Sequence, residues 1–222
     1  SAEPTSLTIL YTNDEHGWIA PSEEGGGAAA MMHRWREEEG YSEDKPYLIL
    51  SGGDMWTGPA LSTWFEGEPT LEVMNAMNYA AAAVGNHEFD FGQESLQQRA
   101  AEAEFPLLAA NLVDAETGEP SDLVLPYAIQ EVNGLTIGIV GLASMGTPRT
   151  AMPTNLEGLR FAPYAETLKS IVPELKGEGA DVLIVISHLC SDEMEALTPT
   201  ARELDIALIG GVSIKQPGEV SL

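Results

Sequence analysis

The sequence predicts an α/β fold in which strands and helices alternate along most of the chain. Two observations support this class. Short apolar runs recur between Gly, Pro, Asn and Asp residues, and amphipathic segments of helical length separate them. This alternation predicts βαβ units, in which right-handed crossovers join parallel strands. With 222 residues, 44% of them hydrophobic, the chain can bury one large core, so we expect a single domain.

In the first half of the chain, apolar runs and amphipathic segments take turns. The runs predict strands at Leu7–Tyr11, Tyr47–Leu50, Ala80–Val84 and Leu107–Ala110. The amphipathic segments predict helices at Ala28–Glu39, Pro69–Met77 and Gln93–Ala103. A turn at Gly25–Gly27 precedes the first helix, and Gly40 follows it, where glycine commonly ends a helix.

The middle of the chain breaks the alternation. Asn133-Gly134, between the apolar runs Tyr127–Val132 and Leu135–Leu142, predicts an antiparallel hairpin. Ala143–Leu159 contains prolines and glycines and predicts an irregular loop. The α/β alternation then resumes with a helix, a strand, a helix and a strand at Tyr164–Lys176, Val182–Ile186, Asp192–Glu203 and Ile206–Ile209.

Side chains that can bind metal ions directly follow four of these strands. They are Asp14, His16, Asp54, Asn86, His87 and His188. In open α/β sheets the ligand crevice lies beyond the carboxyl ends of the strands, so we expect these side chains to converge. Mixed oxygen and nitrogen donors favour Mn, Fe, Zn or Co over Ca. The pattern therefore predicts a site for one or two divalent metal ions.

Local sequence supports individual ligands but also allows structural roles. Asp14 and His16 would lie on the same side of an extended segment, and two glycines before Asp54 allow its backbone to approach a ligand closely. Alone, Asp14 could be a turn residue, Asp54 a cap, Asn86 a left-handed turn residue and His188 an ordinary buried polar group. Their recurrence after strands favours the metal site. His33 lies within a predicted helix, and we expect it at the surface or in packing.

The composition excludes several partners. The net charge of −25, from 35 acidic and 10 basic residues, argues against nucleic-acid binding and against docking to anionic membranes. We expect a solvated acidic surface, and the composition also permits adaptation to high salt. No apolar stretch is long enough for a transmembrane helix.

The single cysteine and the start of the chain say little about location. Cys190 has no partner for an intrachain disulfide, and we expect a small buried residue at a strand end rather than a metal ligand. Ser1–Pro4 has neither a basic nor an apolar segment of the kind a signal peptide needs. We expect any signal peptide to have been removed already.

Several ordered motifs resemble the calcineurin-like metallophosphoesterases, and most closely their 5′-nucleotidase branch, which includes UDP-sugar hydrolases and 2′,3′-cyclic phosphodiesterases. The motifs are Thr12–Gly17, Gly52-Gly53-Asp54, Gly85–Asp90, Ala110-Asn111 and Ser187-His188. The resemblance implies a four-layer α/β/β/α sandwich with mixed sheets. It also implies a periplasmic or secreted hydrolase of nucleotides or related phosphate esters.

The resemblance further implies a role for each residue of the site. Asp14 and His16 would hold one divalent ion, Asn86 and His188 a second, and Asp54 would bridge them; Mn, Zn, Fe, Co and Mg are the candidates. His87 would be the catalytic residue that faces the phosphate, with Asp90 orienting it. Asn86, His87 and Asn111 would contact the substrate. The two ions would activate water for hydrolysis.

The chain departs from this family near residue 211. The family has a Gly-His-x-His metal motif where Val212 and Ile214 stand here, and neither side chain can bind a metal ion. Either the chain is a catalytically impaired relative that serves as a binding or structural domain, or residues are missing between Gly211 and Val212. We prefer the second explanation.

The absence of the Gly-His-x-His motif determines the domain organisation that we expect. Residues 1–211 would form an incomplete metallophosphoesterase domain, and residues 212–222 would be a tail that resembles a later strand. The family's C-terminal domain, which carries nucleotide specificity, would be absent. Trp18, Trp56 and Trp64 could form a stacking platform for a base, but we expect most of them to pack in the core or loops.

Overall fold

The computed structural model describes residues 6–23 and 25–212, whose strands and helices alternate as the sequence predicts. The strands are β1 (Thr8–Thr12), β2 (Tyr47–Ser51), β3 (Tyr79–Ala83), β4 (Leu107–Leu108), β5 (Leu112–Asp114), β6 (Tyr127–Val132), β7 (Leu135–Ala143), β8 (Leu159–Phe161), β9 (Val182–Cys190) and β10 (Ala207–Val212). The helices are α1 (Gly27–Glu37), α2 (Ala60–Trp64), α3 (Glu68–Ala76), α4 (Gly92–Glu102), α5 (Tyr164–Gly177) and α6 (Ser191–Leu204). Short 3₁₀ helices are η1 (His87–Phe89), η2 (Thr147–Arg149) and η3 (Pro153–Leu156).

Eight of these strands form two four-stranded sheets. The first has the order β1-β2-β3-β4 and is parallel throughout. The second has the order β10-β9-β7-β6, in which only the β6–β7 hairpin is antiparallel. This hairpin turns at Asn133-Gly134, as predicted, and the mixed second sheet confirms the expected combination of strand directions.

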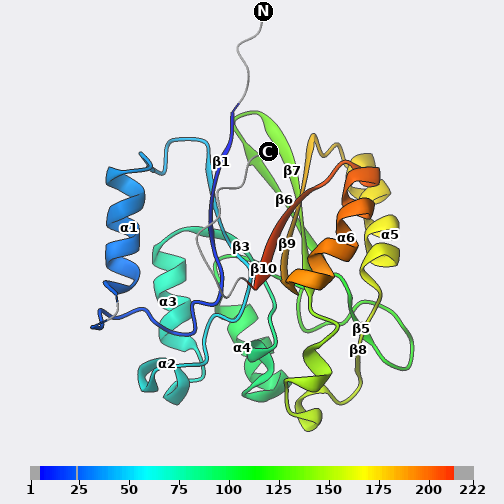
Figure 1. Ribbon diagram of the computed structural model, residues 1–222, viewed down its shortest axis with the longest axis horizontal. Coiled ribbons are helices and arrows are strands. Elements are labelled where there is room, and N and C mark those ends of the chain that lie inside the picture. The colour runs from blue at the N-terminus through cyan, green and yellow to red at the C-terminus, as the bar shows by residue number, and fades with distance from the viewer. Residues whose placement is uncertain (1–5, 24, 213–222) are drawn as a thin grey trace, which may run out of the picture.

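Alternating side chains place the two sheets face to face between layers of helices. Leu48 and Leu50 of β2 pack against Ile137 and Ile139 of β7 in a core between the sheets. Ile49 points the other way, into a core shared with α1, α3 and α4. The opposite face of the second sheet packs on α5 and α6 (Figure 1). The architecture is therefore the predicted four-layer α/β/β/α sandwich.

At Gly141 of β7 the backbones of the two sheets come into contact. The Gly141 carbonyl accepts a hydrogen bond from the N–H of Ala110, at 2.8 Å. A Cβ atom at Gly141 would lie 2.3 Å from the carbonyl oxygen of Leu108. The absence of a side chain here is what lets the sheets join at this point.

Several parts of the chain differ from the expectations. The two-stranded sheet of β5 and β8 and the short helix α2 were not predicted, and β9 continues four residues beyond Ile186. Cys190 is exposed rather than buried, because it lies at the very end of β9, where the chain turns to begin α6. Trp56 is buried as expected, but Trp18 and Trp64 are 56% and 82% exposed.

Two further expectations concern the surface. His33 is exposed on α1, as predicted. Among the residues that the structure describes, no helix is both long enough and apolar enough to cross a membrane.

Candidate metal centre

The loops that follow β1 and β2 run side by side. The strands pair in register up to Thr12 and Ser51, and hydrogen bonds continue beyond them. The Asp14 N–H donates to the Gly53 carbonyl at 3.0 Å, and the His16 N–H donates to the Asp54 carbonyl at 2.9 Å. Both residues predicted as ligands after the first strand therefore lie next to Asp54.

Left-handed backbone conformations bring these side chains together. The φ angles of Asp14, His16 and Asp54 are 56°, 45° and 58°. The expectation that Asp14 and His16 share one side of an extended segment is therefore wrong, because the chain turns at both residues. Such conformations cost free energy for residues with a Cβ atom and are concentrated at functional sites.

The loop after β3 packs directly on Asp54. A Cβ atom at Gly85 would lie 2.2 Å from Asp54 Oδ1, so a side chain there would displace the carboxylate. Two residues later, the His87 N–H donates to the same Oδ1 at 2.9 Å. Asn86 lies between these two contacts and directly precedes η1 in a right-handed conformation, which excludes the left-handed turn alternative.

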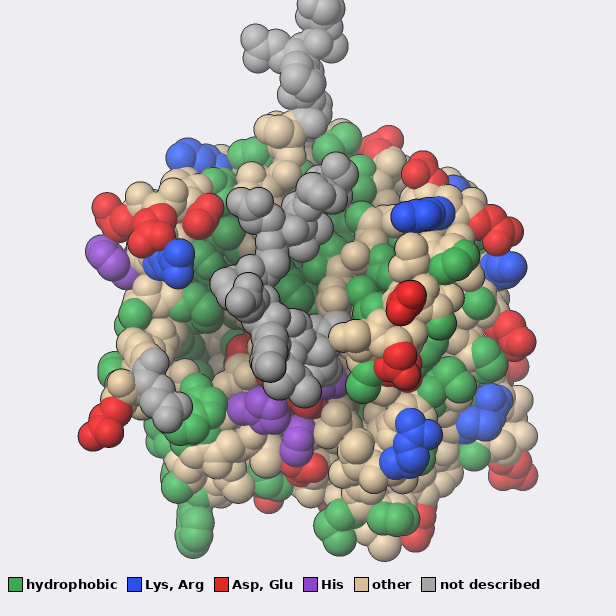
Figure 2. Space-filling model, in the orientation of Figure 1, with side chains coloured by type: hydrophobic (Ala, Val, Ile, Leu, Met, Phe, Trp, Pro, Cys, Tyr) green, Lys and Arg blue, Asp and Glu red, His purple; other side chains and the backbone are tan. Residues whose placement is uncertain are grey.

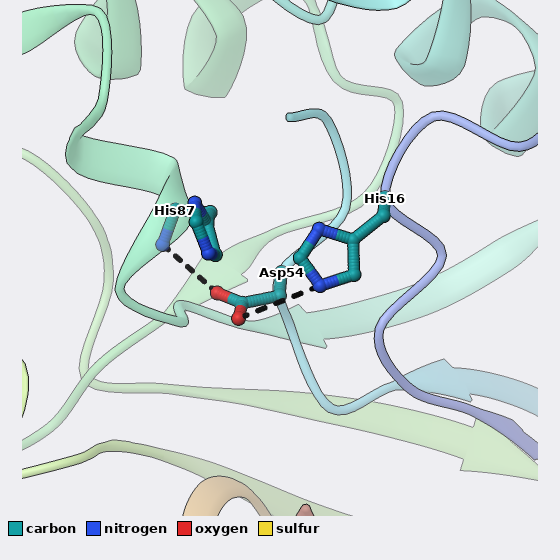
Figure 3. Close-up of side chains that lie close together, drawn as sticks. All are labelled: His16, Asp54 and His87. Atoms are coloured by element: carbon teal, nitrogen blue, oxygen red, sulfur yellow. Dashed lines mark hydrogen bonds and ion pairs between the residues drawn. The ribbon is translucent and has the colours of Figure 1, made fainter. Parts of the chain in front are cut away.

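Asp54 occupies the centre of the cluster. Its Oδ2 lies 2.9 Å from His188 Nε2 and 4.0 Å from His16 Nε2, and His16 Nε2 lies 3.5 Å from Asp14 Oδ1. The rings of His16 and His87 lie on either side of the Asp54 carboxylate (Figure 3). In the space-filling view, histidine side chains gather near the middle of one face beside acidic ones (Figure 2).

Two sets of side chains within this cluster could each hold a metal ion, and Asp54 belongs to both. One set is His16, Asp54 and His87; the other is Asp14, Asp54 and His188. Within each set the candidate ligand atoms lie within 4.8 Å of one another. The grouping differs from the one that the resemblance implies, since Asp14 is grouped here with His188.

The orientation of two histidine rings fits metal binding. His16 Nδ1 lies 2.7 Å from the Thr57 carbonyl, and His188 Nδ1 lies 3.0 Å from the Gly52 carbonyl. A carbonyl can only accept, so each Nδ1 carries the proton and each Nε2 faces the carboxylates. Backbone carbonyls orient metal-binding histidines in this way. The Nε2 atoms of these histidines and the nearby carboxylate oxygens are therefore suitable ligands for a divalent cation.

Charge interactions within the cluster shift its pKa values. The hydrogen bond with Asp14 raises the pKa of His16 to about 9 against the opposing effect of burial. Burial also lowers the pKa of His188, but the Asp54 carboxylate outweighs it and raises that pKa to about 9. The pKa of Asp54 is lowered, because its contact with His188 outweighs its burial. Without a metal ion, imidazolium protons balance the carboxylates, and a bound cation would replace them.

His87 and Asp90 form the expected pair. His87 Nδ1 lies 2.7 Å from Asp90 Oδ2, and the two residues lie at the start and just beyond the end of η1. This contact leaves His87 Nε2 available for another partner. The ring of His87 also lies edge-on to that of His16, with 5.0 Å between ring centroids.

Asn111 is buried and bonded to the backbone at the end of β7. It is fully buried, its Nδ2 donates to the Ala143 carbonyl at 2.8 Å, and its Oδ1 accepts from the Ala143 N–H at 2.9 Å. These bonds tie the segment after β4 to the end of β7. None of the side chain reaches the surface in this structure, and the substrate contact expected of Asn111 stays a prediction.

Glu88 is the residue of the site that the sequence did not reveal. It is 0% exposed and accepts hydrogen bonds from backbone N–H groups of both the β2 and the β3 loops. Burial, and then the nearby Asp54 carboxylate, raise the pKa of Glu88 to about 8. Its position inside the Gly85–Asp90 motif was the available signal, but an acidic residue next to a histidine suggested no particular role.

Comparisons with known proteins agree on one family. The profile of the calcineurin-like phosphoesterases matches residues 7–211, which end just before Val212. The 5′-nucleotidase of Vibrio cholerae is 37% identical over 191 residues, which cover 82% of this chain and 34% of that protein. The chain thus spans about a third of the length of the curated relatives it matches.

Solved structures give the same result. A 5′-nucleotidase precursor from Thermus thermophilus matches with a TM-score of 0.71 at 30% identity, over 86% of this chain and 38% of that one. The NAD nucleotidase of Haemophilus influenzae matches with a TM-score of 0.72 at 28% identity, over 86% and 35% of the two chains.

Proposed function

This chain belongs to the calcineurin-like phosphoesterase family, and we propose that it hydrolyses phosphate esters with the help of two divalent cations. Mn, Zn, Fe, Co and Mg are the candidate ions, because the donors are carboxylate oxygens and imidazole nitrogens. The proposed ligands are Asp14, His16, Asp54, Asn86 and His188.

One observation carries this proposal: the carboxylate of Asp54 belongs to both sets of candidate ligands. A carboxylate carries several lone pairs and can be shared between two ions. Its Oδ2 faces His188 and His16, whereas its Oδ1 faces the loop that carries Asn86 and His87. This arrangement suits a pair of cations better than a single one.

Two bound cations would neutralise the phosphoryl oxygens and lower the pKa of the attacking water. His87 would act from Nε2 by donating a proton to the leaving oxygen, while its Nδ1–H stays bonded to Asp90 Oδ2. Asp90 would keep the ring in this orientation. Because the protein has a net charge of −25, its surface repels anionic substrates, so the local positive charge must come from the bound ions.

Nucleotides are the proposed substrates. The relatives described above are named 5′-nucleotidase and NAD nucleotidase, which supports an ester of a nucleoside. The base and sugar would be recognised by parts of those proteins that this chain does not match. We favour hydrolysis over a purely binding or structural role because the described ligands converge on Asp54.

The segment around Gly211 and Val212, where the resemblance implies two histidine ligands, determines how well these 222 residues would bind metal ions. We propose that the domain comprises residues 1–211 and that residues are missing between Gly211 and Val212. Val212 is the last residue of β10 and pairs with Cys190, whereas Ile214 lies outside the described residues. Sequencing the gene of the source across this point would test the proposal. An uninterrupted Gly-Val junction would favour true substitutions instead.

We also propose a periplasmic or secreted location, which rests on the resemblance to the 5′-nucleotidase branch. Fractionation of the source cells, with mass spectrometry of the protein in each fraction, would test it. Recovery from the cytoplasm alone would contradict the proposal.

The activity can be tested on the purified chain with p-nitrophenyl phosphate and 5′-AMP as substrates and Mn²⁺ as the added cation. We expect hydrolysis that depends on Mn²⁺ and is lost in His188→Ala. His33→Ala is the matched control, because this histidine is exposed on α1. Two bound Mn²⁺ ions without turnover of either substrate would favour the impaired relative.

A further inference from the structure

Glu88 joins the two loops that carry the central ligands. Its Oε2 accepts hydrogen bonds from the Asp54 N–H at 2.8 Å and from the Gly85 N–H at 2.6 Å. Its Oε1 accepts one from the Met55 N–H at 2.7 Å. Asp54 and Met55 follow β2, whereas Gly85 follows β3, so one carboxylate binds backbone atoms of both loops.

These hydrogen bonds satisfy buried N–H groups in a segment whose backbone is irregular. Asp54 has a φ of 58°, and Gly53 before it has a φ of 95°, so the chain has left the parallel ladder. Met55 and Glu88 are fully buried and Asp54 nearly so. Buried N–H groups without an acceptor would cost about 1–3 kcal/mol each. Glu88 supplies the acceptor for three of them.

Stability alone is a poor reason to keep an acid in this place. A buried carboxyl carries a desolvation cost that an apolar residue of similar size avoids. The nearby Asp54 carboxylate adds repulsion between like charges. What Glu88 provides instead is a fixed spacing between Asp54 on one loop and Asn86 and His87 on the other.

We propose that Glu88 is a positioning residue that sets the affinity of the centre for divalent cations by holding the Asp54 and Asn86 loops in one arrangement. The inference rests on the proposed two-cation function. Glu88 itself binds no cation and touches no substrate. Its influence passes through the backbone of Asp54 and Gly85, and outer residues of this kind typically change metal affinity by 10–100-fold.

The variant Glu88→Gln tests the proposal, with Glu94→Gln as the matched control because Glu94 is exposed on α4. The first measurement is backbone amide hydrogen exchange in the metal-free protein. The single carbonyl oxygen of the introduced glutamine can still serve Asp54 and Gly85, but its NH₂ group then faces the Met55 N–H. We therefore expect faster exchange at Met55 above all, and no change in Glu94→Gln.

The second measurement is the affinity for Mn²⁺, titrated into the wild-type and variant proteins. We expect Glu88→Gln to weaken binding by about tenfold or more and Glu94→Gln to leave it unchanged. A purely structural role would lower the unfolding temperature without changing the affinity of the folded protein. If Glu88→Gln does not fold, Glu88→Asp replaces it, because its carboxylate keeps the charge but is one methylene too short to reach both loops.

The outcomes separate the two proposals. Faster exchange at Met55 together with unchanged Mn²⁺ affinity would overturn the positioning role while leaving the two-cation function intact. An equal loss of Mn²⁺ affinity in Glu94→Gln would also overturn the positioning role, because the loss would then come from the change in net charge. A wild-type protein that binds no Mn²⁺ would overturn the proposed function, and with it the role of Glu88.

Discussion

Asp14, His16 and Asp54 all hold backbone conformations that disfavour side chains, and all three belong to the candidate metal centre. Each such conformation lowers the free energy of unfolding by about 1–3 kcal/mol. Hydrogen bonds between the β1 and β2 loops, such as that from the Asp14 N–H to the Gly53 carbonyl, hold them in place. The strain is therefore local and tied to the positions of the ligands.

This strain predicts a conflict between stability and binding at Asp14. At a pH above the His16 pKa of about 9, where its ion pair with Asp14 no longer contributes, we expect Asp14→Gly to raise the free energy of unfolding of the metal-free protein by about 1 kcal/mol, because glycine adopts positive φ without a steric cost. The same change should weaken Mn²⁺ binding. Asn78→Gly is the control, since Asn78 also has a positive φ of 60° but is exposed and absent from both ligand sets. Denaturant unfolding and Mn²⁺ titration of both variants would show whether only Asp14 couples the two properties.

The pair of His87 and Asp90 predicts a loss of turnover without a loss of metal. His87→Ala should reduce turnover about 10²-fold or more, because it removes the proposed proton donor. Asp90→Asn should have a smaller effect, since the asparagine can still hold the ring at Nδ1. Metal analysis beside the kinetic assay decides the role. If His87→Ala lost an ion, His87 would be a ligand, as its grouping with His16 and Asp54 permits.

At the scale of the elements, hydrophobic periodicity predicted the strands and helices that carry large buried faces. β2, β7 and β9 are rich in Ile, Leu and Val and were located to within a few residues. β5 and β8 were missed because each has only three residues, too few for a periodic signal. α2 was missed for the same reason, and two of its exposed residues, Leu61 and Trp64, are apolar.

Sequence reasoning located most of the candidate ligands but not their environment. Convergence at the strand ends followed from the topology of parallel sheets, so Asp14, His16, Asp54, His87 and His188 were all placed together. The left-handed turns at Asp14 and His16 were not foreseen, because they depend on pairing with the β2 loop. Burial of Glu88 and Asn111 was missed because residue type alone does not reveal backbone partners supplied by distant segments.

The contact between the sheets predicts a large effect of a small substitution. Gly141→Ala should destabilise the protein by about 1–3 kcal/mol, because the new methyl group would meet the backbone of Leu108. Gly177→Ala is the control, since a Cβ atom there meets nothing within 4 Å. Denaturant unfolding of both variants is the measurement. Equal stabilities would show that the sheets can separate slightly at no cost.

For the whole molecule, the net charge of −25 predicts that salt stabilises the fold. Repulsion among acidic side chains opposes the compact state, and the Debye length falls from ~10 Å at 0.1 M salt to ~3 Å at 1 M. We expect the unfolding temperature of the metal-free protein to rise as KCl is increased over this range. A constant or falling unfolding temperature would show that charge repulsion is unimportant here.

For the site as a whole, the two proposed cations share the carboxylate of Asp54, which belongs to both sets of candidate ligands. Measuring bound Mn²⁺ per chain in the wild type and in Asp54→Ala tests this sharing most directly, with Asp44→Ala as the control because that aspartate is exposed and absent from both ligand sets. We expect two ions per chain in the wild type and in Asp44→Ala at saturating Mn²⁺, and none held tightly in Asp54→Ala. An Asp54→Ala protein that still binds one ion with wild-type affinity would contradict the shared carboxylate.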